Sequence, residues 1–208
     1  MTNKKSLLQK IFKILKWSFF ILIALIFILF VVRLFHSFNV DKTNRQVSII
    51  HGTKLSIDDV EGKNLPPVPG VEADKTVQGI DVNKNGIRDD VELAIYKEYP
   101  NSAKTRAVLL QYALTLQMEF VQPFINVGVA GEVANKDDRS IFCMSEVTPS
   151  GGESGVIEAI QKYGKFVYDL QFNTQERNTK HKEFYSYVKN GRTDELINCD
   201  IDLSKLPN

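Results

Sequence analysis

The chain has 208 residues, of which 43% are hydrophobic and 25% are charged, and its formal net charge is +1. This length suits one ordinary globular domain, or one domain with an appended segment. The residues before Asp41 include basic residues but no acidic ones, so the rest of the chain is net acidic. This charge argues against a nucleic-acid partner. Two cysteines are too few for a disulfide-framework miniprotein or a four-cysteine zinc site.

Residues 17–35 form the most apolar part of the chain, with Arg33 as their one charged residue. A helix of this length is roughly 28 Å long, which is close to the hydrocarbon thickness of a bilayer. Trp17 stands at one edge, where an indole suits the headgroup level. We therefore predict a transmembrane signal-anchor helix in contact with the lipid bilayer. A cleaved signal peptide and a buried core helix are the alternatives.

The charges that flank this span predict its orientation. Five lysines lie in residues 1–16, whereas only Arg33 is close to the other end. The positive-inside rule places residues 1–16 in the cytoplasm as a basic N-terminus and all later residues on the far side. We expect a single-pass protein of the bacterial inner (cytoplasmic) membrane, with its C-terminal domain in the periplasm or outside the cell.

Residues 36–75 are predicted to form a flexible, Pro-containing tether. They are rich in Asp, Lys and Asn, and an apolar run at Val47–Ile50 is long enough for one short strand. The prolines near its end, at 66, 67 and 69, stiffen the chain toward polyproline II.

Residues 76–208 are predicted to form a small, irregular all-α domain, so the fold class is mostly α. Apolar periodicity and capping residues indicate about four helices. Gly164 weakens the third of them, because glycine costs about 1 kcal/mol relative to alanine inside a helix. The four predicted helices are Asp89–Tyr99, a helix capped by Asn101 or Ser102 that runs to Val121, a helix from Ser154 to Leu170, and one from Asn173 to Gly191. The stretch 124–153 is predicted as a connection.

Residues 81–92 read D-V-N-K-N-G-I-R-D-D-V-E and match the calcium-loop pattern D-x-[DN]-x-[DN]-G-x5-E at every specified position. Calcium takes six to eight oxygen ligands, and this spacing supplies carboxylate, amide and backbone oxygens. A bare turn with a helix cap is the alternative, because Asn85-Gly86 alone favours a tight turn. The predicted ligands of one structural Ca²⁺ ion are Asp81, Asn83, Asn85, Ile87 through its carbonyl, Asp89 and Glu92.

This segment resembles the EF-hand loop, and more closely the single calcium loops of bacterial exported or membrane-anchored proteins that precede only an exiting helix. The resemblance covers residues 81–99 and indicates a module without pointing to a named protein family. Arg88 stands at position 8, where paired EF-hands carry an apolar residue, and no incoming helix is predicted directly before Asp81. These departures imply an unpaired structural site and not a calcium sensor.

The two cysteines, Cys143 and Cys199, both follow the predicted membrane span, so they face a compartment in which thiols oxidise. We predict a disulfide between them, and two buried free cysteines are the alternative. The three histidines, at 36, 51 and 181, follow no metal-ligand spacing, and we expect each to be solvated.

We expect no catalytic site, because the sequence contains no phosphate-binding loop, no dinucleotide fingerprint and no complete G-x-S-x-G motif. Glu119, Glu132 and Glu153 are candidates for a carboxylate acid–base pair, but sequence separation does not place them together.

The sequence favours a membrane-anchored, extracytoplasmic calcium-binding protein that acts as a binding or scaffolding module for an envelope protein partner. The alternatives are a cell-wall hydrolase with carboxylate catalysis and a membrane-held, immunity-type inhibitor.

Overall fold

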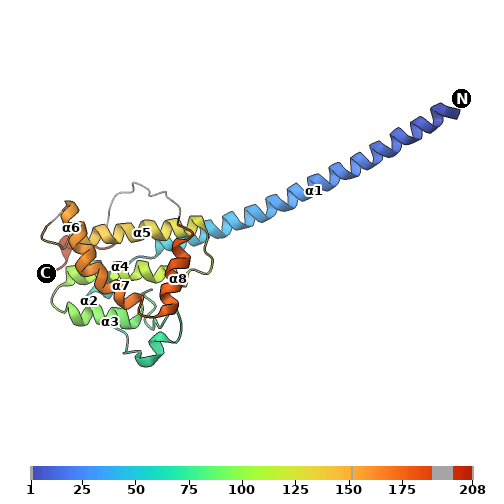
Figure 1. Cartoon of the computed structure of the whole chain (residues 1–208). Coiled ribbons are helices and arrows are strands. Elements are labelled where there is room, and N and C mark those ends of the chain that lie inside the picture. Colours follow the sequence, from blue (N-terminus) through green and yellow to red (C-terminus); the bar gives the residue numbers. More distant parts are fainter. Residues whose placement is uncertain (1, 151, 189–198, 208) are drawn as a thin grey trace. The chain divides into compact units, whose positions relative to one another are not determined.

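The computed structural model describes residues 2–150, 152–188 and 199–207 (Figure 1), with side chains described from Lys10 onward. The described residues are mostly helical, as the sequence predicts. The chain divides into two compact units, residues 1–45 and residues 46–208.

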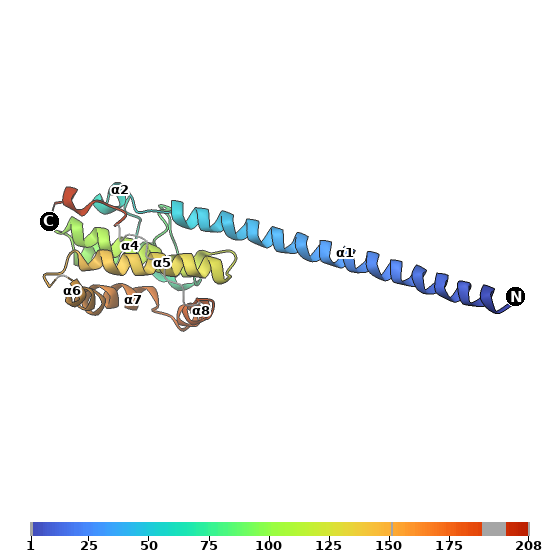
Figure 2. The ribbon, with the colours of Figure 1, turned by 90° about the horizontal axis from the view of Figure 1, so that it is seen from above.

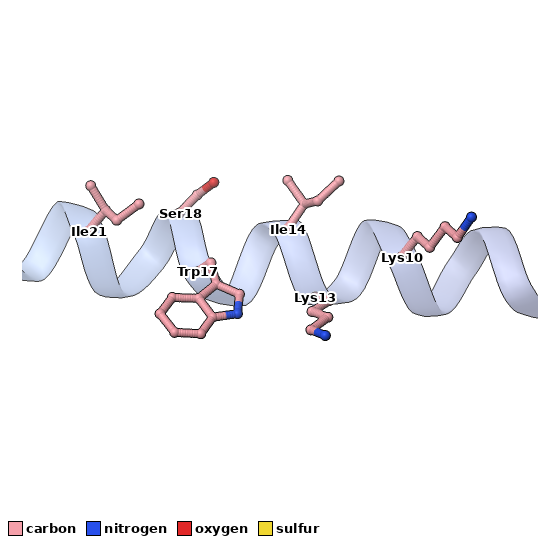
Figure 3. Close-up of a pocket in the computed structure, with 6 residues that line it drawn as sticks. All are labelled: Lys10, Lys13, Ile14, Trp17, Ser18 and Ile21. Carbon is pink, nitrogen blue, oxygen red and sulfur yellow. The ribbon is translucent and has the colours of Figure 1, made fainter.

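The first unit consists of the helix α1, Thr2–Gly52, whose last residues belong to the second unit. This helix is long and apolar enough to cross a membrane, and its apolar side chains are exposed. Figure 3 shows part of α1, in which Lys10 and Lys13 are followed by Trp17 within two turns. Trp17 is the residue at which the membrane span is predicted to begin.

Residues 36–52 continue α1, so the predicted extended tether is wrong for this part, and so is the strand at Val47–Ile50. No glycine or proline interrupts the chain between Arg33 and His51. Gln46 and Ile50 lie one helical turn apart and are both buried in the second unit. Gln46 Nε2 donates to the carbonyl of Phe124 (2.7 Å), which fixes this end of the helix.

The remainder of the predicted tether contains two short helical elements. The α-helix α2 spans Ile57–Glu61, and the 3-10 helix η1 spans Gly70–Asp74. Ser56 and Asp59 form a reciprocal capping box that begins α2, and Val60 is fully buried. This part of the chain is therefore packed onto the domain at Val60, in contrast to the expected tether.

The helix α4, Ala103–Val121, is the centre of the second unit (Figures 1 and 2). Ser102 caps it, as predicted, by accepting a hydrogen bond from Thr105 N. The sequence predicts one apolar stripe, but sixteen of its nineteen residues are buried, so α4 is covered on all sides. Its neighbours are α2, α3 (Asp89–Glu98), α5 (Val127–Ser145), the π-helix η2 (Ile160–Gly164), α7 (Lys165–Gln171) and α8 (Gln175–Tyr185).

The helix α5 occupies residues that the sequence predicts as a connection. Asn126 caps it by accepting from Val129 N (2.9 Å). Its buried stripe includes Lys136 and Ser140 among apolar residues, and Gly131 lies in its second turn. These interruptions dilute the apolar periodicity and explain why the pattern does not indicate a helix.

The third predicted helix consists of α6 (Gly152–Ala159), η2 and α7 in succession. The π-helical turn ends at Gly164, the residue that weakens the helix prediction. The fourth predicted helix is α8, but its cap is Thr174, which accepts from Arg177 N, and not Asn173. Its predicted end at Gly191 lies outside the described residues.

Cys143 in α5 and Cys199 form the predicted disulfide, with a Cα–Cα distance of 5.3 Å. The bridge spans a sequence separation of 56 residues. Closing a loop of that length stabilises the fold by about 4 kcal/mol in the chain-entropy model.

Gln117 in α4 joins two other parts of the domain through its buried amide. Its Nε2 donates to the carbonyl of Gln78 (2.7 Å), and its Oε1 accepts from Gln171 Nε2 (2.5 Å). Both Gln117 and Gln171 are almost fully buried. The carbonyl of Gln78 and the side-chain amide of Gln171 therefore both form a hydrogen bond with Gln117.

Replacing Gln117 by leucine should lower the free energy of unfolding by about 2–3 kcal/mol, because buried polar partners lose their hydrogen bonds. Urea unfolding of the purified protein measures this change. The matched control is Gln175→Leu, an exposed residue of α8, which should stay within about 0.5 kcal/mol of the parent. Equal stability of the two variants would contradict the role of Gln117.

Candidate functional site

The predicted calcium loop, residues 81–92, leads directly into α3. Asp81 Oδ1 and Asn83 Oδ1 both accept from the backbone N–H of Asn85, at 3.2 Å and 3.3 Å. Asp81 Oδ2 also accepts from Gly86 N (2.9 Å), and Gly86 has a φ of +84°. The positive φ is the reason that this turn requires glycine. Positions 1 and 3 of the loop therefore lie on the same side of the turn, as the pattern predicts.

Glu92 lies in the first turn of α3 and is only 1% exposed. Its Oε2 accepts a hydrogen bond from Asn83 Nδ2 (3.0 Å). Burial raises the pKa of Glu92 to about 7, although the hydrogen bond from the Asn83 amide acts to lower it. Positions 1, 3 and 12 of the predicted ligand set are thus brought together.

Asp89 is also buried, but its carboxylate joins the two ends of the loop. It accepts from Val82 N at 3.0 Å, and its own N–H donates to the carbonyl of Ile80 (2.8 Å). Burial raises the pKa of Asp89, as it does that of Asp81. Across the described ranges, no three side chains of His, Cys, Asp or Glu lie in a metal-binding arrangement.

The chemistry of the donor set nevertheless fits a hard cation. Asp81, Asp89 and Glu92 form no ion pair with a basic side chain in the described part of the chain. The oxygen of the Asn85 amide, which the pattern assigns as a ligand, accepts a hydrogen bond from Ile87 N (2.9 Å) within the same turn. Ile87, the position-7 residue, buries its side chain in the core, which leaves its carbonyl as the donor that the pattern assigns.

Arg88, which departs from the EF-hand pattern, has a structural role that the sequence did not indicate. Its guanidinium is fully buried and donates to both carboxylate oxygens of Asp90, at 2.5 Å and 2.8 Å. It also donates to the carbonyls of Leu170 (2.7 Å) and Gln171 (3.1 Å) at the end of α7. Arg88 therefore fastens the loop to α7, and its charge is balanced by Asp90 and not by the predicted calcium ligands.

A second group of acidic residues lies between α4, α5 and α8. Glu119 is almost fully buried, and its Oε2 lies 2.6 Å from His181 Nδ1. Asp137 Oδ2 accepts from the hydroxyl of Tyr185 (3.0 Å), while Asp137 Oδ1 is buried and lacks a hydrogen-bond partner among the described residues. The imidazole of His181 also packs against Tyr168 (5.5 Å between ring centroids), so the prediction of a solvated His181 is wrong.

The other two candidate glutamates do not join Glu119. Glu132 Oε2 lies 2.7 Å from Nε2 of His51. Glu153 is exposed on α6. The acidic neighbour of Glu119 that the sequence did not indicate is Asp137. Burial is the largest cause that raises the pKa of Asp137 to about 7, and the charge of Glu119 is the next.

No protein family, curated protein or solved structure matches this chain.

The raised pKa of Asp137 predicts a pH-dependent stability. Between about pH 4 and pH 7 the folded protein retains a proton that the unfolded chain has released, so stability should fall as the pH rises through this window. Asp137 faces Glu119 of α4 and His181 and Tyr185 of α8, and it adjoins Asp138 on α5. Asp137→Asn should reduce the fall in the free energy of unfolding between these pH values. Urea unfolding in EDTA at several pH values measures this change.

The control is Asp169→Asn, because Asp169 is an exposed carboxylate of α7. This variant should keep the pH dependence of the parent. An unchanged slope in Asp137→Asn would contradict the assignment of the raised pKa.

Proposed function

We propose that this chain is a membrane-anchored, extracytoplasmic calcium-binding protein of the bacterial envelope, and that it binds or scaffolds a protein partner without catalysis. One observation carries the calcium assignment: Asp81, Asp89 and Glu92 form no ion pair with a basic side chain within the described ranges. Buried carboxylates are costly without a counter-charge, and a divalent cation would supply one.

The proposed ligands are the side-chain oxygens of Asp81, Asn83 and Asn85, the carbonyl of Ile87, and the carboxylates of Asp89 and Glu92. Asn83 donates its Nδ2 to Glu92 in the structure, so ion binding requires this amide to present its oxygen instead. The bound ion would supply positive charge at the start of α3 and hold the loop in one conformation.

Two features support the proposed location. The helix α1 is long and apolar enough to cross a membrane, and the lysines before Trp17 favour a cytoplasmic N-terminus. The Cys143–Cys199 disulfide is typical of a domain in an oxidising compartment. A calcium-stabilised domain held at the membrane suits a binding or scaffolding role.

Calcium should raise the melting temperature of the full-length protein in lipid nanodiscs. If the dissociation constant is about 10⁻⁴–10⁻³ M, as in extracellular modules, about 5 mM calcium adds about 1–2 kcal/mol and shifts the melting temperature by several degrees relative to EDTA. Glu92→Gln should abolish the shift, because it removes a charged ligand.

The matched control for this experiment is Glu98→Gln, which changes an exposed glutamate on the same helix. The control should retain the full calcium shift. A parent protein that melts at the same temperature in calcium and in EDTA would overturn the calcium assignment.

A second candidate function is a carboxylate hydrolase of the cell wall. It is favoured by the proximity of Glu119 and Asp137, whose pKa values are both raised chiefly by burial. Paired carboxyl groups with raised pKa values are suited to general acid–base chemistry.

Incubation of the full-length protein with purified peptidoglycan distinguishes the two functions. The scaffolding proposal expects no release of soluble fragments. Release that is lost in Glu119→Gln but retained in Glu153→Gln, the exposed control, would establish the hydrolase instead.

A further inference from the structure

A pocket of about 340 Å³ opens between α4, α5, η2 and α7. This volume lies at the lower end of the range for small-molecule sites. Its apolar wall is formed by Ile141, Met144 and Ile160, and two tyrosines, Tyr112 and Tyr168, also line it. The pocket is separate from the calcium loop, and the proposed function does not use it.

The π-helical turn and its glycine form one wall of this pocket. Gly164 has ordinary helical angles, and a Cβ there would approach Met144 Cε at 3.6 Å and Tyr112 Cε1 at 3.9 Å without a clash. Alanine would therefore fit and would favour the helix by about 1 kcal/mol. The backbone does not require this glycine, but its lack of a side chain keeps the space between Met144 and Tyr112 open. Single π-helical turns occur frequently at functional sites.

The polar groups of the pocket are available to a ligand. Neither the Tyr112 nor the Tyr168 hydroxyl forms a hydrogen bond with any residue that the structure describes. At the rim, Lys165 Nζ and Asp169 Oδ2 form an ion pair of 2.6 Å, and both side chains are more than half exposed. An ion pair this exposed contributes little stability, so Asp169 can exchange Lys165 for a ligand cation.

The electrostatic surroundings of the pocket favour a positive ligand. Burial raises the pKa of both tyrosines, which keeps their hydroxyls neutral, and Asp137 and Glu119 add to this effect at Tyr112. Tyrosine ring faces attract cations. The buried acidic pair beside Tyr112 would in turn repel an anion whenever either carboxyl group is ionised.

We propose that this pocket binds a small amphipathic cation, with an apolar body against Ile141, Met144 and Ile160 and a protonated amine at the tyrosines and Asp169. The apolar wall supplies most of the buried surface, and the amine selects among ligands by charge. This site would operate whether or not the loop at residues 81–92 binds calcium.

Three probes with the same apolar body test the proposal: para-isopropylbenzylamine, para-isopropylbenzyl alcohol and para-isopropylbenzoate. The full-length protein, labelled with ¹³C at its methionine methyl groups, is titrated in phosphatidylcholine nanodiscs. Met144 lines the pocket, whereas Met118 is buried in α4 away from it. The amine should shift the Met144 signal in a saturable way, leave Met118 unmoved, and bind at least tenfold more tightly than the benzoate.

Two variants locate the binding. Gly164→Leu should fill the pocket and abolish the Met144 shift, whereas Gly131→Leu, in a part of α5 with free space around its Cβ position, should preserve it. Should Gly164→Leu fail to fold, the double variant Tyr112→Phe with Tyr168→Phe, which removes hydroxyls without a described partner, should weaken amine binding several-fold. Equal affinity for all three probes, tighter binding of the benzoate, or no shift at Met144 would each overturn the proposal.

Discussion

A helix buried on nearly every side must find partners within the protein for most of its polar groups, and this constraint on α4 organises the domain. Burying an amide, hydroxyl or carboxyl group without a partner costs more than the group's best hydrogen bond returns. Four buried polar side chains of α4 accordingly pair with groups in other parts of the chain. The described pairs are Gln111 with the N–H of Asp200, Thr115 with Ser140, Gln117 with Gln78 and Gln171, and Glu119 with His181.

Local signals predicted the elements that local residues determine. The membrane-length apolar span, the Ser102 cap and the helix that follows Asp89 are all confirmed. The helix α5 escaped prediction because Lys136 and Ser140 on its buried side obtain their partners from Thr53 and Thr115, which are distant in sequence. The sequence predicts that the helix ends before residue 36, whereas α1 continues to Gly52. The reason is similar, since the burial of Ile50 depends on the folded domain.

The candidate sites also divide into features that neighbouring residues determine and features that depend on residues distant in the sequence. The loop at residues 81–92 is predictable because its chemistry is contained in a dozen consecutive residues. Arg88 is different, because its partners at Leu170 and Gln171 are more than eighty residues away. The Glu119–His181 pair joins two helices that are 62 residues apart, so no spacing rule could have found it.

The Cys143–Cys199 disulfide, which joins α5 to the C-terminal segment, affects how the domain responds to cleavage of its backbone. Beyond Cys199, Asp200 accepts a hydrogen bond from Leu55 N (3.0 Å), and Leu206 is buried in the core. If a protease cuts the backbone once between the two cysteines, the fragments stay covalently joined. The severed tail would still occupy its place beside Leu55, and separation of the pieces would require a reductant as well as the cut.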